Sequence, residues 1–92
     1  MKDDVKCEIS KEVLCVLERI MCTPAVEIEL HFREALNGKY FRFDAIKMAY
    51  FILEMRKLFG IRLSYEELRV CSYWSPQRFV DFNAQQSENR RA

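Results

Sequence analysis

The sequence predicts an all-α fold, and three observations favour it. Only two glycines and two prolines occur among 92 residues, which is few for a β architecture rich in turns. Half of the residues are hydrophobic and 13% are aromatic, enough for the dense core that so short a chain needs. Apolar residues also recur at helical spacing near the N-terminus, at positions Ile9, Val13, Val16, Leu17 and Ile20. We therefore expect one helical domain over residues 1–92, with its core at about 9–83 and a polar tail at 84–92.

The charge and hydropathy of the chain argue against several classes of function. A net charge of +1 provides no overall field that would attract nucleic acid or an anionic membrane. No apolar run approaches the roughly 18 residues of a membrane-spanning helix. The first four residues, Met1-Lys2-Asp3-Asp4, are charged and unlike the apolar stretch of a signal peptide. We expect a cytoplasmic protein that has no membrane span and binds no nucleic acid.

The cysteines do not have the spacing of a zinc site, because no Cys-x-x-Cys pair occurs and the chain has a single histidine. We therefore expect no bound metal. Cys15 and Cys22 are seven residues apart and would share one face of a helix. We expect Cys7, Cys15, Cys22 and Cys71 to be buried free thiols, with a redox or metal role as the minor alternative.

The first helix is expected at residues 10–21. Ser10 is a suitable N-cap, and Pro24 ends the helix because the residue before a proline avoids the helical conformation. Residues 26–32 then alternate between apolar and polar, as a β-strand does, but no second strand is available to pair with them. We expect an extended or partly helical connection that lays Ile28, Leu30 and Phe32 on the bundle.

Capping residues place three further helices. The second begins after the N-cap Asp44 and ends at Gly60, which can adopt the left-handed conformation that follows a helix. Ser64 and Glu67 form a capping box that opens a short third helix. A fourth helix begins at Ser75-Pro76 and extends to about Ala84, with an apolar face made by Phe79, Val80 and Phe82.

The second helix resembles that of an acyl or peptidyl carrier protein. The family's motif is Asp-Ser-Leu or Asp-Ser-Ile, followed by an amphipathic helix that ends in Phe-Gly-Ile. Here the chain has Asp44-Ala45-Ile46 at the start and Phe59-Gly60-Ile61 at the end. Phe32 and Leu36 are similar to an apolar pair in the family's long first loop, although residues 36–44 are longer and more aromatic than usual. The resemblance covers about residues 9–83 and implies a four-helix carrier-like bundle with a long first loop and a short third helix.

Position 45 departs from the family's central chemical rule. In ordinary carriers the motif serine carries a phosphopantetheine arm, whose phosphate lies at a helix N-terminus. Ala45 has no side-chain oxygen that could be phosphorylated. The resemblance therefore implies no covalent cofactor, and phosphopantetheine only if position 45 is natively serine. Carrier-like proteins without this serine include the acyl-carrier-related proteins of bacterial peptide-maturation systems, which is the context that we favour.

The resemblance also implies a partner-facing surface on the second helix. Carried over residue by residue, that surface consists of Ile46, Lys47, Ala49, Tyr50, Leu53, Arg56 and Lys57. Ordinary carriers present acidic residues here, whereas this face is apolar and basic. It therefore favours a dedicated partner enzyme with an acidic or apolar docking surface. The alternative is that Tyr50 and Leu53 belong to the core, because a helix that is apolar all round is commonly buried.

Other single residues give weaker signals. His31 lies near Glu29 and Glu34, but a lone histidine without a nucleophile is more typical of a surface residue than of an acid–base catalyst. We expect Trp74 to fill the core. Phe59 is expected to be a central core residue that joins the second helix to the first and the fourth.

The favoured function is a non-enzymatic accessory protein, related to carriers, that docks onto a biosynthetic enzyme without a covalent arm. One alternative is an active acyl carrier in which serine has been replaced by Ala45. A second is a small lipid-binding protein whose helices enclose a free acyl chain. A third is a helical interaction module unrelated to carriers.

Overall fold

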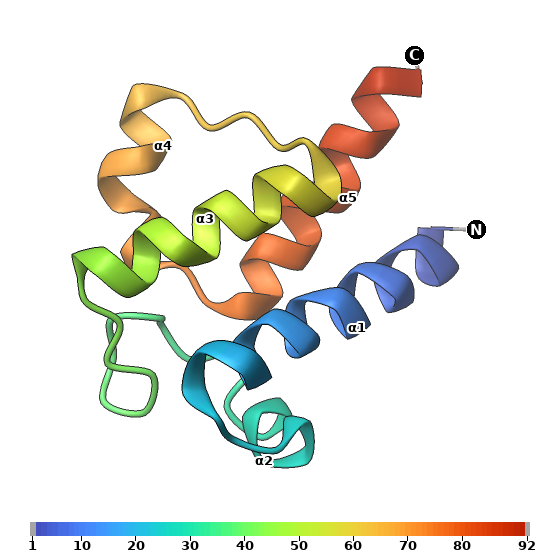
Figure 1. Cartoon of the computed structure of the whole chain (residues 1–92). Helices are drawn as coiled ribbons and strands as arrows, with labels where there is room; N and C mark the ends of the chain where they lie inside the picture. The colour runs from blue at the N-terminus through green and yellow to red at the C-terminus, as the bar shows by residue number, and fades with distance from the viewer. Residues whose placement is uncertain (1, 92) are drawn as a thin grey trace.

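Helices α1 (Lys2–Met21), α2 (Ala25–Glu29), α3 (Ala45–Phe59), α4 (Tyr65–Val70) and α5 (Pro76–Arg91) build the fold, with a short 3-10 helix η1 (Cys71–Tyr73) between α4 and α5 (Figure 1). The computed structural model describes the backbone of residues 2–91 and the side chains of residues 4–88. No strand occurs within residues 2–91, and the all-α fold class is confirmed.

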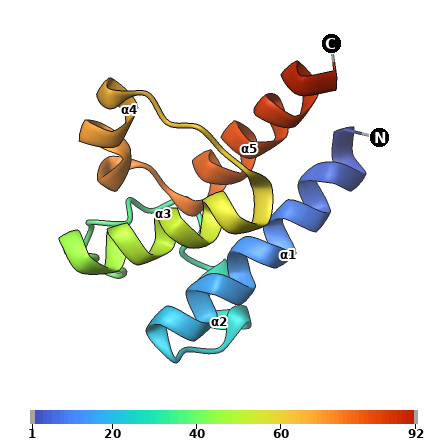
Figure 2. The same ribbon diagram turned by 45° about the horizontal axis from the view of Figure 1, so that its top comes forward.

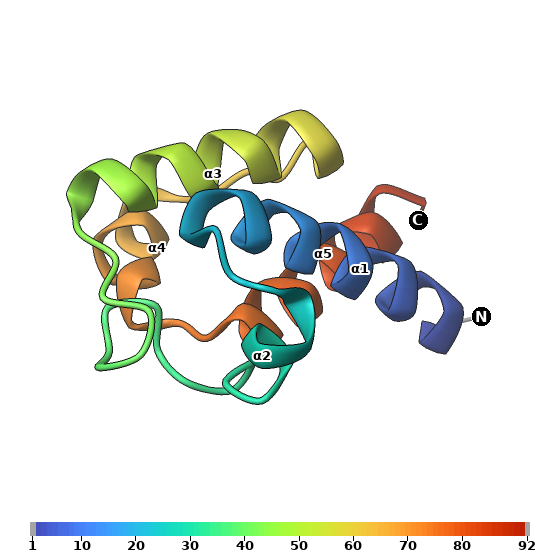
Figure 3. The same ribbon diagram turned by 60° about the horizontal axis from the view of Figure 1, so that its bottom comes forward.

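Helix α1 lies at the centre of the arrangement, because it packs against α2, α3 and α5. Figure 3 shows α3 on one side of α1 and α2 on the other. The two ends of the described chain lie at the same end of the molecule, and α4 lies at the opposite end (Figure 2). The short helix α4 is thus remote from the contact between α1 and α5.

Helix α1 begins at Lys2, so the predicted start at Ser10 is wrong. Residues 2–9 contain no glycine or proline, and Val5 and Ile9 extend the apolar stripe of the helix by two turns. Ser10 therefore lies inside the helix rather than at its cap. The helix ends where expected, with Cys22 in the left-handed conformation (φ 52°) just before Thr23-Pro24.

The connection between α1 and α3 is partly helical, as predicted. Backbone hydrogen bonds fix it to the segment that joins η1 to α5. The N–H of Leu36 donates to the carbonyl of Trp74 at 2.9 Å, and the N–H of Gln77 donates to the carbonyl of Phe32 at 3.0 Å. Both Phe32 and Leu36 are buried. Burial of these two residues closes the connection onto the core.

Leu30 is 80% exposed, so the prediction that it packs on the bundle is wrong. The prediction assumed the alternation of an extended chain. The helical turn of α2 and the turns that follow it instead place Ile28 and Phe32, four residues apart, on the same side, and both are buried. Leu30 then points away from them.

The expected caps of α3, α4 and α5 are present. Gly60 has φ 62° and ψ 31°, and its N–H donates to the carbonyl of Arg56 at 2.9 Å. Ser64 and Glu67 form the reciprocal capping box. The hydroxyl of Ser75 accepts a hydrogen bond from the N–H of Arg78 at 3.2 Å.

Helix α5 continues to Arg91, beyond the end predicted near Ala84. No glycine or proline follows Ala84, and Ala84 itself is buried. The Gln86 amide further anchors this segment, because it accepts from the N–H of Arg62 at 3.0 Å and donates to the carbonyl of Arg62 at 2.7 Å. The expected polar tail is therefore helical through residue 91.

Aromatic rings connect the residues before α3 to α5 through the core. Phe43 lies edge-on to Phe51 with ring centroids 6.2 Å apart, and Phe51 lies edge-on to Phe79 at 5.0 Å. Edge-to-face pairs of this kind add to the stabilisation from burial. Trp74 is 8% exposed and its ring centroid lies 5.1 Å from that of Phe79, which confirms its expected place in the core.

Phe59 is half-buried, so the prediction of a central core position is wrong. The fully buried positions of α3 are Phe51 and Met55. Phe59 is the last residue of the helix and packs against the core from its edge.

Three of the four cysteines are exposed, so the prediction of buried thiols holds for Cys71 alone. Cys7 and Cys15 lie on the side of α1 opposite to the buried stripe that contains Val13 and Val16. Cys22 follows the end of the helix and does not continue its face.

Candidate docking site on helix α3

The start of α3 has the local geometry of a capped helix N-terminus. Asp44 is in an extended conformation, and its Oδ1 accepts a hydrogen bond from the N–H of Lys47 at 2.9 Å. Ala45 is the first helical residue and is exposed, and Ile46 beside it is 80% exposed. Position 45, which the carrier resemblance predicted as an inactive attachment site, is therefore accessible and offers only a methyl group.

All seven residues carried over as a docking surface are exposed, and we call them the α3 outer face: Ile46, Lys47, Ala49, Tyr50, Leu53, Arg56 and Lys57. Tyr50 is 48% exposed and Leu53 is 54% exposed. The opposite side of the helix is buried, at Met48, Phe51 and Met55. The alternative in which Tyr50 and Leu53 belong to the core is therefore wrong.

Three cations border the α3 outer face, and the carboxylate of Glu54 lies near two of them. Lys47 lies at the start of the helix, and Arg56 and Lys57 lie in its last turn, where cations are favoured by the helix dipole. The side chain of Glu54 is only 13% exposed, because Arg19 lies 3.3 Å and Lys57 3.9 Å from its carboxylate. The face therefore presents an apolar centre with a basic border.

A hollow of about 510 Å³ separates the first half of α3 from α4 and η1. Ala45 and Ala49 line it on α3, and Leu68 and Cys71 line it on the other side. The hollow joins the α3 outer face to residues of α4 and η1, which were not among the predicted docking residues.

Helix α4 contains no buried residue, which its sequence did not lead us to expect. Its exposed apolar side chains, with that of η1, are Tyr65 at 74%, Leu68 at 48%, Val70 at 46% and Tyr73 at 69%. The sequence held a signal for part of this pattern. Leu68 and Val70 are two residues apart and do not share one face of a helix, so a helix packed on one side only leaves at least one of them exposed.

His31 contacts one of its two neighbouring carboxylates. Its Nδ1 pairs with Glu34, and its ring stacks on that of Tyr40 with centroids 3.6 Å apart. The hydroxyl of Tyr40 is buried and without a hydrogen-bond partner. Burial of this hydroxyl, and then the negative charges of Glu27 and Glu34, raise the pKa of Tyr40. The cluster fixes the connection before α3 and brings no nucleophile to the histidine.

The helices within residues 2–91 are each too short or too polar to cross a lipid bilayer. Comparisons with protein-family models, with curated proteins and with solved structures gave no match to this chain.

Proposed function

We propose that this chain is a carrier-related accessory protein that docks onto a biosynthetic or modifying enzyme through the α3 outer face. It acts without enzymatic activity and without a phosphopantetheine arm. Its favoured context is bacterial peptide maturation. The order of its elements supports the proposal: a long helix, a long connection, the helix that starts with Asp44-Ala45-Ile46, a short helix and a final helix follow one another.

The observation that carries the proposal is the exposure of Ile46, Tyr50 and Leu53 along one helix. Monomeric proteins rarely expose contiguous apolar patches larger than a few hundred Å², and exposed apolar patches rimmed by polar residues commonly mark interaction sites. Tyrosine and arginine are also enriched among the residues that contribute most to binding at interfaces. The α3 outer face provides both types, in Tyr50 and Arg56.

The charges of the α3 outer face indicate the kind of partner. Lys47, Arg56 and Lys57 favour an acidic surface around an apolar centre. Opposite charges at the border of an interface accelerate association, and like charges oppose it. A basic docking surface of the kind that ordinary carriers meet would be repelled here.

The proposal is tested by isolating the partner with the tagged chain and then measuring the binary affinity and association rate. We expect Tyr50→Ala to weaken binding by about 30-fold, as for a central aromatic anchor. Arg56→Glu with Lys57→Glu should slow association, most strongly at low salt. Both variants should keep the melting temperature of the parent, because surface substitutions usually change stability by no more than about 0.5 kcal/mol.

Two exposed positions elsewhere provide matched controls. Leu30→Ala, on a leucine that is 80% exposed, is compared with Leu53→Ala, and Lys11→Glu on α1 is compared with the reversed charges on α3. Both controls should bind as the parent does. Undiminished binding by the Tyr50 and Arg56/Lys57 variants would refute docking through this face.

A further inference from the structure

A second exposed surface lies on α2, on the side of α1 away from α3 (Figure 3). Val26 is 76% and Leu30 80% exposed, and both point away from the buried Ile28. Glu27 and Glu29 are exposed beside them, and neither has an ion-pair partner among the described side chains. Residues 25–34 carry three glutamates and one arginine, so this surface is acidic around an apolar centre. We call Val26, Glu27, Glu29 and Leu30 the α2 outer face.

A hollow of about 530 Å³ lies beside Leu30, between α1, α2 and the start of α5. Leu14 and Phe32 add to its apolar wall, and Glu29 and Arg33 also line it. Its volume falls within the range of small-molecule sites, so it can receive one large side chain. Aromatic anchors at protein interfaces commonly fill pockets of this kind. The hollow therefore gives the α2 outer face a place for an aromatic side chain of a bound protein.

The α2 outer face has the properties that the α3 outer face requires of a partner. The α3 outer face is basic around an apolar centre, whereas the α2 outer face is acidic around one. Val26 and Leu30 are four residues apart, as Ile46 and Tyr50 are, so the two apolar centres match in spacing. Opposite charges at the border of an interface favour association. The two faces are therefore complementary in charge and in the spacing of their apolar side chains.

The carboxylates of α4 fit the α3 outer face less well. Glu66 pairs with Arg69 at 3.5 Å, so a cation already balances its charge. The carboxylate of Glu67 accepts a hydrogen bond from the N–H of Ser64 at 2.8 Å. Both carboxylates of α4 are therefore engaged within their own helix.

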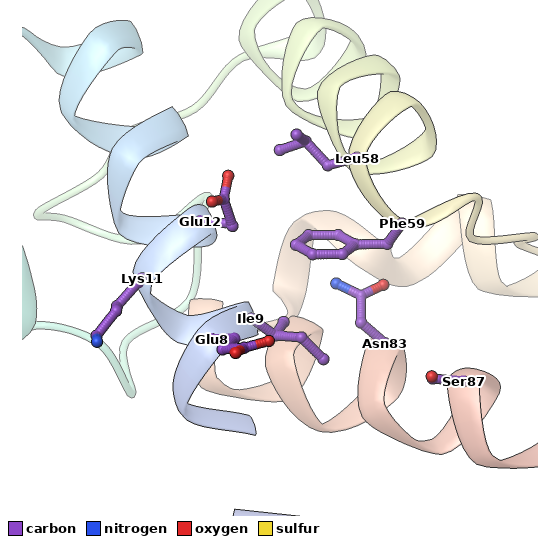
Figure 4. Close-up of a pocket in the computed structure, with 8 residues that line it drawn as sticks. All are labelled: Glu8, Ile9, Lys11, Glu12, Leu58, Phe59, Asn83 and Ser87. Atoms are coloured by element: carbon purple, nitrogen blue, oxygen red, sulfur yellow. The ribbon is translucent and has the colours of Figure 1, made fainter. Parts of the chain in front are cut away.

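The carboxylates at the start of α1 lack an exposed apolar centre. Glu8 and Glu12 lie beside a hollow between α1, the end of α3 and α5 (Figure 4). Ile9 is the apolar residue that α1 contributes to this hollow, and it is buried. The ring of Phe59 covers Asn83, whose buried Oδ1 has no hydrogen-bond partner among the described residues. The α2 outer face is therefore the acidic surface that fits the α3 outer face best.

We propose that a second copy of this chain docks its α2 outer face on the α3 outer face, with Tyr50 of one copy in the hollow beside Leu30 of the next. The contact is head-to-tail, because it joins two different surfaces. The two faces lie on opposite sides of α1, so one copy can bind two neighbours at once (Figure 3). Both surfaces are small, and we expect a weak dissociation constant of about 0.1–1 mM.

Self-association of this kind covers the α3 outer face when no enzyme is bound. An enzyme that docks there displaces the neighbouring copy, because both use the same residues. The inference rests on the proposed function in one respect, which is that the α3 outer face is a docking surface.

Sedimentation velocity of the chain alone tests the proposal. At low salt we expect the weight-average mass to rise with concentration between about 0.02 and 1 mM, and at about 0.5 M salt to return towards that of the monomer. Val26→Ala with Leu30→Ala should lower the association constant by about tenfold, and so should Tyr50→Ala. All three positions are exposed, so these variants should fold. Leu68→Ala, at a residue of α4 that is 48% exposed, is the control and should associate as the parent does.

An equimolar mixture of the Val26/Leu30 variant and the Tyr50 variant tests the direction of the contact. Each variant keeps the face that the other lacks, so the mixture should form a heterodimer with nearly the affinity of the parent. Growth should stop there, because the two remaining faces are both defective. A mixture that does not associate, or undiminished association by the Val26/Leu30 variant, would overturn the proposal.

The parent chain and the enzyme provide the remaining outcomes. A parent that stays monomeric at about 1 mM also overturns the proposal and leaves the α2 outer face to a partner other than a second copy. Enzyme binding is measured at dilutions where the chain is monomeric, and there the Val26/Leu30 variant should bind as the parent does. Failure of self-association and failure of enzyme docking are therefore distinguishable.

Discussion

Arg19 on α1 donates a hydrogen bond to the carboxylate of Glu54 on α3, with 3.3 Å between Nη2 and Oε2. The two residues are 35 positions apart in the sequence, so the bond fixes one helix against the other. It also covers most of the Glu54 carboxylate, which lies beside the basic border of the α3 outer face. The contact therefore has two effects: it holds α3 against α1, and it reduces the negative charge that a partner would meet on the α3 outer face.

Glu54→Gln should separate these two effects. We expect the free energy of unfolding to fall by about 0.5–1 kcal/mol, as for a partly exposed ion pair. Binding of an acidic partner should become tighter and its association faster, because Arg19 and Lys57 lose a counter-charge. Urea denaturation and stopped-flow association measure the two quantities.

The matched control for Glu54 is Glu66→Gln on α4. Glu66 also pairs with an arginine, Arg69, at 3.5 Å, but its side chain is 79% exposed. Its loss should change neither stability nor association. Weaker partner binding by Glu54→Gln would contradict an acidic docking surface.

The lack of a side-chain oxygen at Ala45 predicts that the chain cannot accept a phosphopantetheine arm. After incubation with coenzyme A and a promiscuous phosphopantetheinyl transferase, intact-mass spectrometry should show no added mass, because position 45 has no nucleophilic oxygen. Ala45→Ser should accept the arm if the transferase tolerates Lys47 and the basic helix. Ala49→Ser, one turn later on the same face, serves as the control and should remain unmodified. Addition of the arm to the parent chain would disprove the prediction.

Phe51 and Phe59 should differ in their contribution to stability. Phe51 is fully buried, so Phe51→Ala should cost about 3–5 kcal/mol of unfolding free energy. Phe59 is half-buried, and Phe59→Ala should cost about 1–2 kcal/mol, in proportion to the smaller area that it removes from water. Urea denaturation of both variants measures the two losses of unfolding free energy. A larger loss for Phe59 would place the centre of the core at the end of α3.

Tyr40 should make stability depend on pH in the alkaline range. Burial and nearby carboxylates raise its pKa in the folded protein, so the unfolded chain loses the phenolic proton first, near pH 10. The contribution is fully present below that pH and is lost as the pH rises towards the folded pKa. Tyr40→Phe should reduce this decline above about pH 10, whereas Tyr73→Phe, at a residue that is 69% exposed, should not. An unchanged pH profile for Tyr40→Phe would contradict the assigned cause.

Local signals predicted the helix boundaries that depend on capping residues. Asp44 and Ser64 act through hydrogen bonds three residues away, so the sequence contains both partners. Ser10 misled the prediction because the same residue type is tolerated inside a helix when apolar neighbours such as Val5 and Ile9 continue the packing. Leu30 was misplaced because alternation in a short segment does not distinguish a strand from a helical turn.

The α3 outer face could be predicted because a motif fixed the register of the helix, and register determines which residues are exposed. The lack of burial along α4 and the unpaired oxygen of Asn83 could not be predicted in the same way. Both depend on which segments surround these residues. Nothing in the local sequence around Asn83 indicates that Met55, 28 residues earlier, faces its amide.

Trp74 is the single tryptophan of the chain, and its surroundings make it an intrinsic fluorescence reporter. Its ring lies 5.1 Å from that of Phe79 and 5.3 Å from that of Phe82, and the Arg78 guanidinium lies 4.7 Å above it. These contacts all come from α5, away from the α3 outer face. Its emission should therefore follow the folding of the domain while remaining unchanged when a tryptophan-free partner segment binds, so that one spectrum distinguishes a variant that has lost its partner from one that has lost its fold.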